Sequence, residues 1–324
     1  MEGPELGRQV TQRELPLGLT STDRVAITGA NGWLGREIIH QLQELAPEVE
    51  ILALGSRVSE LRLGDHSPIA IKQWSATNVE QWAPTLFLHL AFLTKERVED
   101  MSTVDYIAAN RSISHAALKA FEWPTIRGVV VASSGAALTQ TTEPYGALKA
   151  SDEADFSEAG RRYNIPTVVA RAWSLSGEFC TKPSSFMLFS LIAQALDSTD
   201  RIRIRADHEV LRRYVDAGEY LRLCLAAAAH GWTGTVDSTG ELIEARELAE
   251  LVQRVLGTSK PVHRPEIVGE PDRYESSEVC LANLAEAYGD PLTGLESQIR
   301  ISMQAISVST LNSSVSESRE VGER

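Results

Sequence analysis

A glycine-rich segment near the N-terminus constrains the fold of this chain more than any other feature. Gly29, Gly32 and Gly35 follow a short apolar run over 25–28, and they precede a segment in which apolar residues recur at the spacing of one helix face. In such a strand–turn–helix unit, the first glycine permits a tight turn, the second lets a pyrophosphate approach the backbone, and the third lets the helix pack against the strand. The free N–H groups and the dipole at the helix N-terminus attract the anion. The segment therefore predicts a dinucleotide-binding corner.

The remaining apolar runs predict a parallel sheet with helices on both faces. Further strands are expected over 50–54, 69–74, 86–91, 128–132 and 167–171, and long helices over 98–121 and 145–163. Continuous apolar strands that alternate with helices are typical of a parallel sheet that is buried on both sides. We therefore expect an α/β fold, a Rossmann-type doubly wound parallel sheet, with its ligand at the carboxyl ends of the strands.

The chain is long enough to hold a nucleotide domain and a smaller lobe. The polar, aperiodic composition of both ends predicts a flexible arm and a disordered tail. The expected division is an arm over 1–22, an NAD(P)-binding Rossmann domain over 23–176 to which the chain returns at about 211–244, a mixed α/β substrate lobe over 177–210 and 245–305, and a tail over 306–324. The substrate should lie in the cleft between domain and lobe.

Composition argues against several classes of function. The formal charge of −13 is unfavourable for a nucleic-acid-binding surface. No apolar run reaches the ~20 residues that a membrane span needs, and the first residues lack the basic start and apolar core of a signal peptide, so we expect a cytoplasmic protein. The three cysteines show no disulfide or metal spacing, and we identify no carboxylate or cysteine at ligand spacing from any histidine other than His89, so we expect no metal site.

The end of the second predicted strand selects the cofactor. A carboxylate there would hold the ribose hydroxyls of NAD, whereas a cation accommodates the additional phosphate of NADP. Here the strand ends in Leu54, Gly55, Ser56 and Arg57, without an acidic residue. Arg57 can pair with a phosphate and Ser56 can donate to it. NADP(H) is therefore favoured over NAD(H), unless Arg57 is a solvated loop residue.

The catalytic candidates follow the strand over 128–132. Ser133 and Ser134 stand at its carboxyl end, and Tyr145 has a lysine, Lys149, four residues further along a predicted helix. This spacing places both side chains on one helix face. A carbonyl that receives a hydride must also receive a proton, and a nearby ammonium stabilises the phenolate and so lowers the pKa of a phenol towards neutral pH. The serine hydroxyl can hold the substrate oxygen in line.

These motifs together resemble the extended short-chain dehydrogenase/reductases, and more narrowly their nucleotide-sugar epimerase/dehydratase branch. The resemblance rests on the glycine turn, on the His-Leu-Ala run over 89–91, on the Ser-Ser-Gly run over 133–135 and on Tyr145 with Lys149, and it extends from about residue 24 to about residue 302. It implies that Ser134, Tyr145 and Lys149 are the catalytic set, with Tyr145 as the acid/base and Lys149 also holding the nicotinamide ribose. The cofactor contacts that we expect are Gly29, Asn31, Gly32, Trp33, Leu34, Gly35, Ser56, Arg57, Leu90, Ala91, Ser133, Tyr145 and Lys149.

The same resemblance implies the partners. The expected substrate is a nucleotide sugar, with Arg212 meeting its phosphates and Ser134 and Ser174 also in contact with it. Ser174 stands where the family often has an asparagine. The family's habit further implies a homodimer formed through the helices over 98–121 and 145–163.

Departures from the family pattern narrow the chemistry. Dehydratases of this family carry an Asp-Glu pair directly after the catalytic serine or threonine, and Gly135 and Ala136 stand there in this chain, which argues against 4,6-dehydration. Two reactions remain: reduction of a keto group on a nucleotide-activated sugar, which NADP(H) favours, and epimerisation with a tightly held cofactor. A non-catalytic NADP-binding sensor or scaffold is the alternative outside the enzymes.

Three further features have more than one interpretation. The alternating run Arg201 to Arg205 can form a diphosphate clamp or a solvated strand face. His89 follows a buried strand pattern, so we interpret it as a structural residue near the cofactor rather than as a general base. Trp173 is adjacent to the predicted site and could stack on a base, but a packed core tryptophan is the preferred interpretation.

Overall fold

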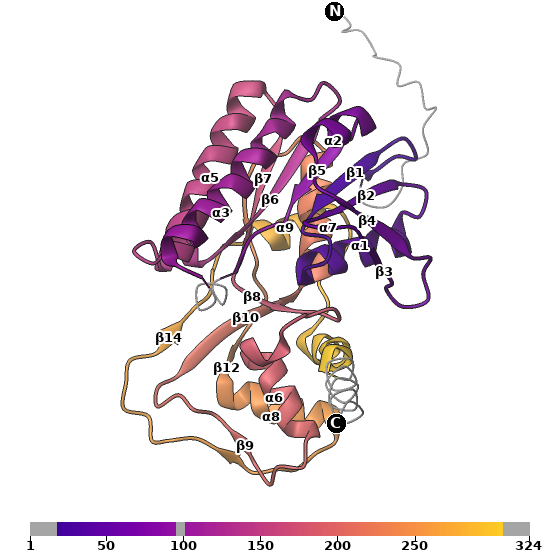
Figure 1. Ribbon diagram of the computed structural model, residues 1–324. Helices are drawn as coiled ribbons and strands as arrows, with labels where there is room; N and C mark the ends of the chain where they lie inside the picture. The colour runs from indigo at the N-terminus through magenta and orange to yellow at the C-terminus, as the bar shows by residue number, and fades with distance from the viewer. Residues whose placement is uncertain (1–17, 95–100, 307–324) are drawn as a thin grey trace, which may run out of the picture.

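An eight-stranded sheet covered by helices forms the larger part of the molecule (Figure 1). The computed structural model describes residues 18–94 and 101–306. The strand order is β11-β7-β6-β5-β1-β2-β4-β3, and every neighbouring pair is parallel except β3 with β4. The strands are β1 (Arg24–Thr28), β2 (Glu50–Gly55), β3 (Ser59–Leu61), β4 (Ile69–Gln73), β5 (Leu86–His89), β6 (Gly128–Ser134), β7 (Thr167–Ala172) and β11 (Gly234–Asp237).

Helices cover this sheet on both faces because its strands are apolar on both sides. In β1, Val25 and Ile27 belong to one core cluster and Ala26 to another, and all three are fully buried. The first cluster includes residues of α1, α7 and α9, and the second includes residues of α2, α3 and α5. The helix bounds are α1 (Trp33–Leu45), α2 (Ala76–Trp82), α3 (Thr103–Leu118), α5 (Pro144–Tyr163), α7 (Ala217–Ala229) and α9 (Cys280–Ala287), with a short α4 (Ala136–Thr139) and a 3-10 turn η3 (Lys119–Glu122).

A smaller lobe lies below the carboxyl ends of the central strands in Figure 1. It contains α6, α8 and a last helix over 295–306, which pack around a separate core cluster, and a mixed sheet in which β10 pairs with β8, β12 and β14. The elements are β8 (Ser174–Ser176), η4 (Pro183–Ser185), α6 (Met187–Leu196), β9 (Ile202–Arg203), β10 (Val210–Asp216), β12 (Glu241–Glu244), α8 (Ala245–Leu256), β13 (Val262–His263) and β14 (Asp272–Arg273).

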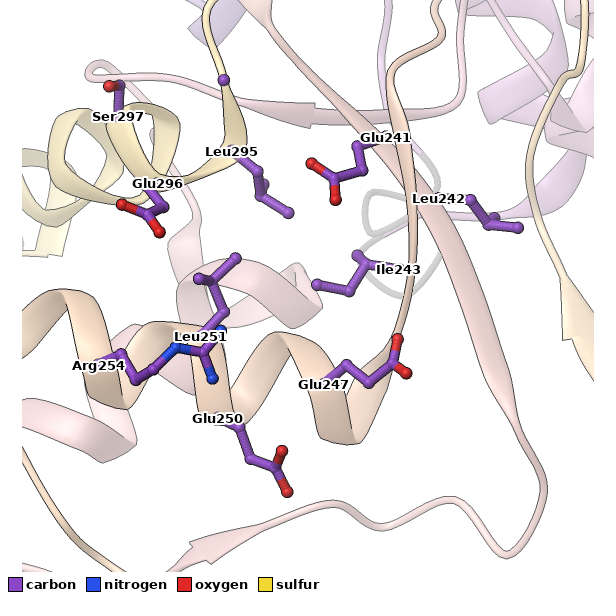
Figure 2. Close-up of a pocket in the computed structure, with 11 residues that line it drawn as sticks. Glu241, Leu242, Ile243, Glu247, Glu250, Leu251, Arg254, Leu295, Glu296 and Ser297 are labelled. Carbon is purple, nitrogen blue, oxygen red and sulfur yellow. The ribbon is translucent and has the colours of Figure 1, made fainter.

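A cavity lies within this lobe (Figure 2). It has a volume of about 680 Å³ and lies between β12, α8 and the helix over 295–306. Its walls combine leucine and isoleucine side chains with four exposed glutamates and Arg254. None of the glycine-turn residues lines it, so this cavity is separate from the predicted dinucleotide corner.

The domain boundaries differ from those expected in three places. The chain returns to the large sheet only with α7 and β11, because β10 and β12 pair within the sheet of the lobe. Helix α9, which we had assigned to the lobe, packs against α7 and β11 and joins the core of the nucleotide domain. Leu19, which we had placed in the flexible arm, is fully buried in that same core. The rest of the expected arm, residues 1–17, and the tail from 307 lie outside the described residues.

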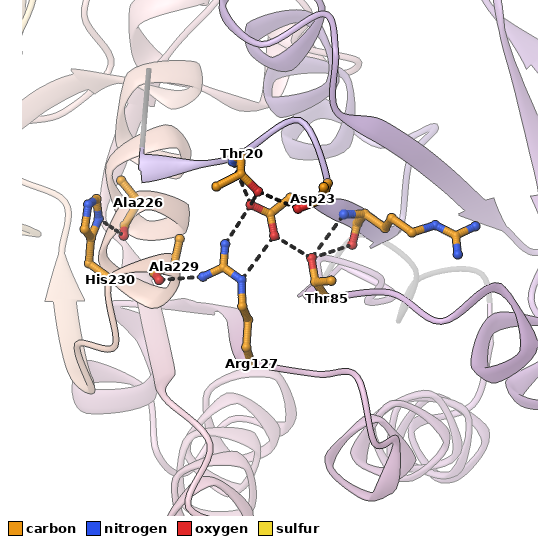
Figure 3. Close-up of polar contacts among 9 residues, drawn as sticks. Thr20, Asp23, Thr85, Arg127, Ala226, Ala229 and His230 are labelled. Atoms are coloured by element: carbon orange, nitrogen blue, oxygen red, sulfur yellow. Dashed lines mark hydrogen bonds and ion pairs between the residues drawn. The ribbon is translucent and has the colours of Figure 1, made fainter. Parts of the chain in front are cut away.

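An ion pair between the buried Asp23 and the partly exposed Arg127 fastens the start of the nucleotide domain (Figure 3). The carboxylate of Asp23, just before β1, accepts from Arg127 at 2.8 Å and from the hydroxyl of Thr85 at 2.7 Å. Arg127 also donates to the carbonyl of Ala229 at the end of α7. One cation therefore joins the starts of β1 and β6 to the end of α7.

None of the helices within the described ranges is long and apolar enough to cross a membrane.

Candidate functional site

The turn between β1 and α1 has the geometry that a dinucleotide cradle requires. Gly29 has a φ of +71°, and a Cβ there would lie 2.8 Å from the backbone nitrogen of Ala91. A Cβ on Gly35 would lie 2.3 Å from the carbonyl oxygen of Gly29, so the close approach of α1 to the turn needs glycine. At Gly32 a Cβ would meet only that carbonyl, at 3.1 Å, so this glycine faces open space. The first turn of α1 thus points unobstructed N–H groups at a possible anion.

A cavity of about 420 Å³ lies beside this turn. It is formed at the carboxyl ends of β1, β2 and β5 and is closed on one side by α3. The residues that line it are Thr28, Gly29, Asn31, Gly32, Leu54, Gly55, Ser56, Arg57, Trp74, His89, Leu90, Ala91, Phe92, Leu93, Ile113, Ala116 and Ala117. Seven of the predicted cofactor contacts are therefore brought together here: Gly29, Asn31, Gly32, Ser56, Arg57, Leu90 and Ala91.

The charge on the lining of this cavity is positive. No carboxylate is among the described residues that form it, and Arg57 is the one arginine or lysine. Arg57 is exposed and makes no hydrogen bond or ion pair within the described chain. A second cation, Arg36 in α1, donates its Nε hydrogen to the carbonyl of Asn31 at 3.1 Å and has no acidic partner among the described residues. The sequence analysis missed Arg36, although its place directly after Gly35 was visible.

Trp33 and Leu34, expected as cofactor contacts, turn their side chains away from the cavity. The Trp33 ring packs edge-on against Phe186 at 4.9 Å, and its indole N–H donates to Glu37 at 2.7 Å. Leu34 packs against the core of the nucleotide domain. Contacts from these two residues to a cofactor would therefore come from their backbone, and the cofactor contacts expected of them stay predictions.

Glu37 joins α1 to the lobe through a buried carboxyl. Its Oε1 accepts from the backbone N–H of Phe179 at 2.9 Å as well as from Trp33. Burial raises the pKa of Glu37 to about 8, and the nearby Asp216 carboxyl acts in the same direction. The pKa of Asp216, which caps α7, is itself raised to about 6 by burial. At neutral pH the Glu37 carboxyl is therefore mostly protonated.

Ser133 is held by an ion-pair network instead of facing the cavity. Its hydroxyl donates to Glu153 of α5 at 2.5 Å, and Glu153 pairs with Arg171 at 2.6 Å. Arg171 also pairs with Asp237, which accepts from the indole of Trp173. The predicted cofactor contact of Ser133 is therefore not supported by the direction of its hydroxyl. Trp173 is half-buried and belongs to none of the core clusters of the described residues, so the preferred interpretation as a core tryptophan is not borne out.

Tyr145 and Lys149 are brought together around Phe92. Lys149 is buried, donates its Nζ hydrogen to the carbonyl of Ala132 at 2.9 Å, and lies 3.7 Å from the centre of the Phe92 ring. The Tyr145 ring meets the same ring edge-on, with centres 5.7 Å apart. Burial lowers the pKa of Lys149 to about 8, against the attraction of two carboxylates on the same helix.

Phe92 separates this pair from the cofactor cavity. It lines the cavity, whereas neither Tyr145 nor Lys149 does. The ring therefore occupies the approach from the cavity to the Lys149 ammonium. Sequence analysis did not select Phe92, and its only signal was its place just beyond the carboxyl end of β5.

Ser134 lies on the lobe side of the site, next to a tyrosine that the sequence analysis missed. Its hydroxyl is 2.9 Å from the hydroxyl of Tyr274, which follows β14. The ring of Tyr274 packs on Trp173 at 5.0 Å, and the guanidinium of Arg212 lies 5.7 Å from its centre. Arg212 also donates to Asp272 at 2.6 Å. Two of the predicted substrate contacts, Ser134 and Arg212, thus both meet Tyr274.

The third predicted substrate contact, Ser174, lies in β8. It pairs in register with Tyr214 of β10, the strand that carries Arg212, and it is half-buried. The run from Arg201 to Arg205 contributes only the short β9, which pairs with β13 at the end of the lobe farthest from the nucleotide domain (Figure 1). Arg201 pairs with Asp200 there, so the run has the solvated role of the two that we considered.

His89 is a buried neutral side chain at the wall of the cavity. Its Nδ1 is 3.0 Å from the hydroxyl of Thr28, and its ring stacks on Phe156 at 5.3 Å. Burial, together with the charge of Lys149, lowers the pKa of His89 to about 3. An imidazole with this pKa does not act as a base at neutral pH, which agrees with the structural role that we expected.

One cluster contradicts the reasoning behind our expectation of no metal site. His40 and Glu44 stand four residues apart on α1, a ligand spacing that the sequence analysis overlooked. His66, from the segment between β3 and β4, meets them, and one ligand atom from each residue lies within 4.8 Å of the others.

Comparisons with known proteins agree with this geometry. The model of the NAD dependent epimerase/dehydratase family matches residues 25–237. No curated protein matches the chain in sequence.

Several solved structures share the fold. The chain is similar to a UDP-N-acetylglucosamine 4-epimerase from Methanobrevibacter ruminantium M1 in complex with UDP-N-acetylmuramic acid, with a TM-score of 0.70 and 18% identity over 89% of this chain and 99% of that chain. It is also similar to a UDP-glucose 4-epimerase with UDP-glucose from Thermotoga maritima, with a TM-score of 0.67 and 17% identity over 89% and 99% of the two chains. A third similar structure is a dTDP-glucose 4,6-dehydratase from Bacillus anthracis in complex with NAD, with a TM-score of 0.68 and 15% identity over 88% of this chain and 96% of that chain. At these identities the likeness shows the fold alone, and it confirms the doubly wound Rossmann-type architecture.

Proposed function

The chain belongs to the NAD dependent epimerase/dehydratase family, and from this premise we propose that it reduces a keto group of a nucleotide-activated sugar with NADPH. The observation that carries the choice of cofactor is the charge of the cavity at the end of β2. Among its described lining residues Arg57 is the one arginine or lysine and none is a carboxylate. A 2′-phosphate needs such a cation, whereas the ribose of NAD is normally held by an acid at this place.

The residues present fit a dinucleotide. Gly29, Gly32 and Gly35 leave backbone room for a pyrophosphate at the start of α1, and Ser56 with Arg57 would hold the phosphate on the adenosine ribose. When bound, the cofactor supplies the hydride that reduces the substrate carbonyl. Lys149 would hold the nicotinamide ribose once the ring of Phe92 moves from its Nζ.

Tyr145 is the proposed proton donor to the oxygen of the reduced carbon. Its phenol proton goes to the forming alkoxide, and the ammonium of Lys149 stabilises the phenolate that remains. Ser134 would hold the same substrate oxygen, exchanging its contact with Tyr274 for the substrate. Arg212, which is half-buried and faces Tyr274, would meet the phosphates of the nucleotide sugar.

The packing at Gly135 argues against water elimination. Dehydratases of this family carry an Asp-Glu pair just after the catalytic serine or threonine. A Cβ on Gly135 would lie 2.3 Å from Cε3 of Trp173, so the first position of that pair has no room for a side chain. Asp237 fixes this tryptophan through its indole N–H. Reduction and epimerisation, which need no such pair, are therefore favoured over dehydration.

Epimerisation is the second candidate because it needs the same Tyr145 and Lys149. The chain shares its fold with 4-epimerases over nearly their whole length, as it does with a 4,6-dehydratase, so the fold is compatible with epimerisation without selecting it. Epimerisation differs in requiring that the cofactor stay bound while the substrate turns over. A binding measurement therefore separates the two.

The first experiment measures the binding of NADPH and NADH to the purified protein and identifies any cofactor that copurifies. We expect NADPH to bind at least ~10-fold more tightly, because an arginine–phosphate contact contributes about 1.5–3 kcal/mol. Arg57→Ala should remove this preference and leave NADH binding unchanged. Arg62→Ala is the matched control, since Arg62 is exposed in the following segment, pairs with Glu60 and does not line the cavity. Tightly retained NAD would refute the reductase and favour the epimerase.

A second variant separates an enzyme from a sensor. Tyr145→Phe keeps the ring that packs on Phe92 and removes the proton donor. We expect turnover of a keto-sugar nucleotide to fall by about 10²–10⁴-fold while NADPH binding is retained. Unchanged turnover would remove Tyr145 from the mechanism.

A further inference from the structure

We propose that His40, Glu44 and His66 form a binding site for a divalent transition-metal ion, and that Zn²⁺ is the ion that fits it best. The site stands at the C-terminal half of α1, on the side of the nucleotide domain where the segment between β3 and β4 passes. Nε2 of His66 lies 2.5 Å from Oε1 of Glu44, and Nε2 of His40 lies 4.0 Å from that same oxygen. Two imidazoles and one carboxylate are a ligand set that zinc accepts.

The distances are close to those of a loaded site. Zinc binds imidazole nitrogen and carboxylate oxygen at about 2.0–2.2 Å, so two ligand atoms in a tetrahedral site lie roughly 3.3 Å apart. The separation of His66 from Glu44 must therefore lengthen and that of His40 from Glu44 must shorten, each by less than about 1 Å. Glu44 is about half exposed, which leaves a remaining coordination position to water.

Packing holds the three ligands near one another before any ion binds. The ring of Phe179 packs against His40 at 5.0 Å, and the His40 and His66 rings meet edge-on at 5.2 Å. Gln43 of α1 donates to the carbonyl of Ser67 at 2.9 Å, which fixes the segment that carries His66. The ligands thus come from two parts of the chain that are already joined, so binding would need little ordering.

The ion would have a structural role. It would tie the segment over 62–68 to α1, and this segment connects the edge strand β3, which follows Arg57, to β4. His40 is two helical turns beyond Trp33, and none of the three ligands lines the cofactor cavity. The site is therefore separate from Tyr145 and Lys149 and would stabilise the adenosine side of the domain without taking part in the reaction.

The test titrates Zn²⁺ into the full chain without an affinity tag, in competition with a chromophoric chelator. We expect one tight equivalent per chain, a rise in the melting temperature of a few degrees on adding Zn²⁺, and a loss of at least ~10-fold in affinity in each of His40→Ala, Glu44→Gln and His66→Ala. The control variants are His263→Ala, which removes an exposed histidine of the lobe, and Cys280→Ser, which removes the least buried thiol. Both should bind Zn²⁺ as the wild type does.

Zinc-edge X-ray absorption of the loaded wild type gives an independent reading that needs no variant. We expect a first coordination shell of nitrogen and oxygen atoms at about 2.0–2.2 Å from the zinc, with the outer-shell signal of two imidazole rings. Sulfur in the first shell, or equal affinity in the wild type and the three ligand variants, would overturn the proposal. So would the absence of a tight equivalent in the wild type.

Discussion

Removing the ring of Phe92 should tighten the binding of NADPH. In the described structure this ring lies 3.7 Å from Nζ of Lys149 and meets Tyr145 edge-on. We propose that the nicotinamide ribose takes the place of the ring at Lys149, so both ring contacts must be lost when the cofactor binds. Phe92→Ala removes them in advance, and the cofactor then binds without that cost.

The magnitude follows from the two contacts. A desolvated cation over an aromatic face contributes about 2 kcal/mol, and an edge-on aromatic pair about 1 kcal/mol. Because 1.4 kcal/mol corresponds to a factor of ten, a total of about 3 kcal/mol sets an upper limit of roughly 100-fold. We expect a decrease of about 10- to 30-fold in the Kd for NADPH, since the freed Lys149 ammonium regains part of this energy elsewhere.

Fluorescence titration with NADPH measures the effect, and two controls locate it. The fragment 2′,5′-ADP carries the adenosine half of the cofactor without the nicotinamide ribose, so its affinity should be the same in the wild type and in Phe92→Ala. Ile113→Ala removes an apolar side chain from the same cavity that has no aromatic ring to lie over Lys149, and it should not tighten NADPH binding. Weaker NADPH binding in Phe92→Ala would refute the reasoning, because the ring would then be a surface on which the cofactor packs.

Two further predictions concern stability. Glu37→Gln should make the free energy of unfolding less dependent on pH. Burial raises the pKa of Glu37 from 4.5 to about 8, so between these pH values the folded protein holds more protons than the unfolded chain. The free energy of unfolding of the wild type therefore falls by up to ~1.4 kcal/mol per pH unit as the pH rises. Urea unfolding of wild type and variant at about pH 5 and about pH 8 measures this slope, and an equal slope in both would contradict the assignment. Gly135→Ala should lower the free energy of unfolding by about 1–3 kcal/mol, because its Cβ would lie 2.3 Å from the Trp173 ring. Gly294→Ala, where a Cβ meets nothing within 4 Å, should have little effect, and equal losses in the two variants would contradict the packing argument.

The sequence predicted those parts of the molecule whose pattern is local. The glycine turn, the buried strands and the spacing of Tyr145 and Lys149 each lie within one short segment, where periodicity and residue type are informative. The structure places these elements in the expected order and at the expected edge of the sheet. Their contacts with cofactor and substrate stay predictions.

The parts that the sequence did not predict depend on residues that are far apart in the chain. Tyr274 contacts Ser134, from which it is 140 residues distant in the sequence, because β14 pairs with β10 in the sheet of the lobe. No sequence pattern near either residue predicts that strand pairing. The direction of the Ser133 hydroxyl is likewise set by Glu153, which Arg171 holds in place. Helix α9 lies in the nucleotide domain and not in the lobe, because its apolar face packs on α7. The sequence of an apolar face does not show which element it packs against.

The first turn of α1 has a consequence for exchanging parts between related proteins. The backbone of Trp33 lies at the nucleotide cradle, and its ring packs among the aromatic side chains of the lobe. Glu37, four residues after Trp33 in the same helix, accepts a hydrogen bond from the backbone N–H of Phe179. A chimera that joins this nucleotide domain to a foreign substrate lobe would leave the Trp33 indole and the protonated Glu37 carboxyl without their partners at the interface between domain and lobe. Grafts should therefore carry Trp33 and Glu37 with the lobe that matches them, so that the crossover points fall inside α1 and not between the two bodies.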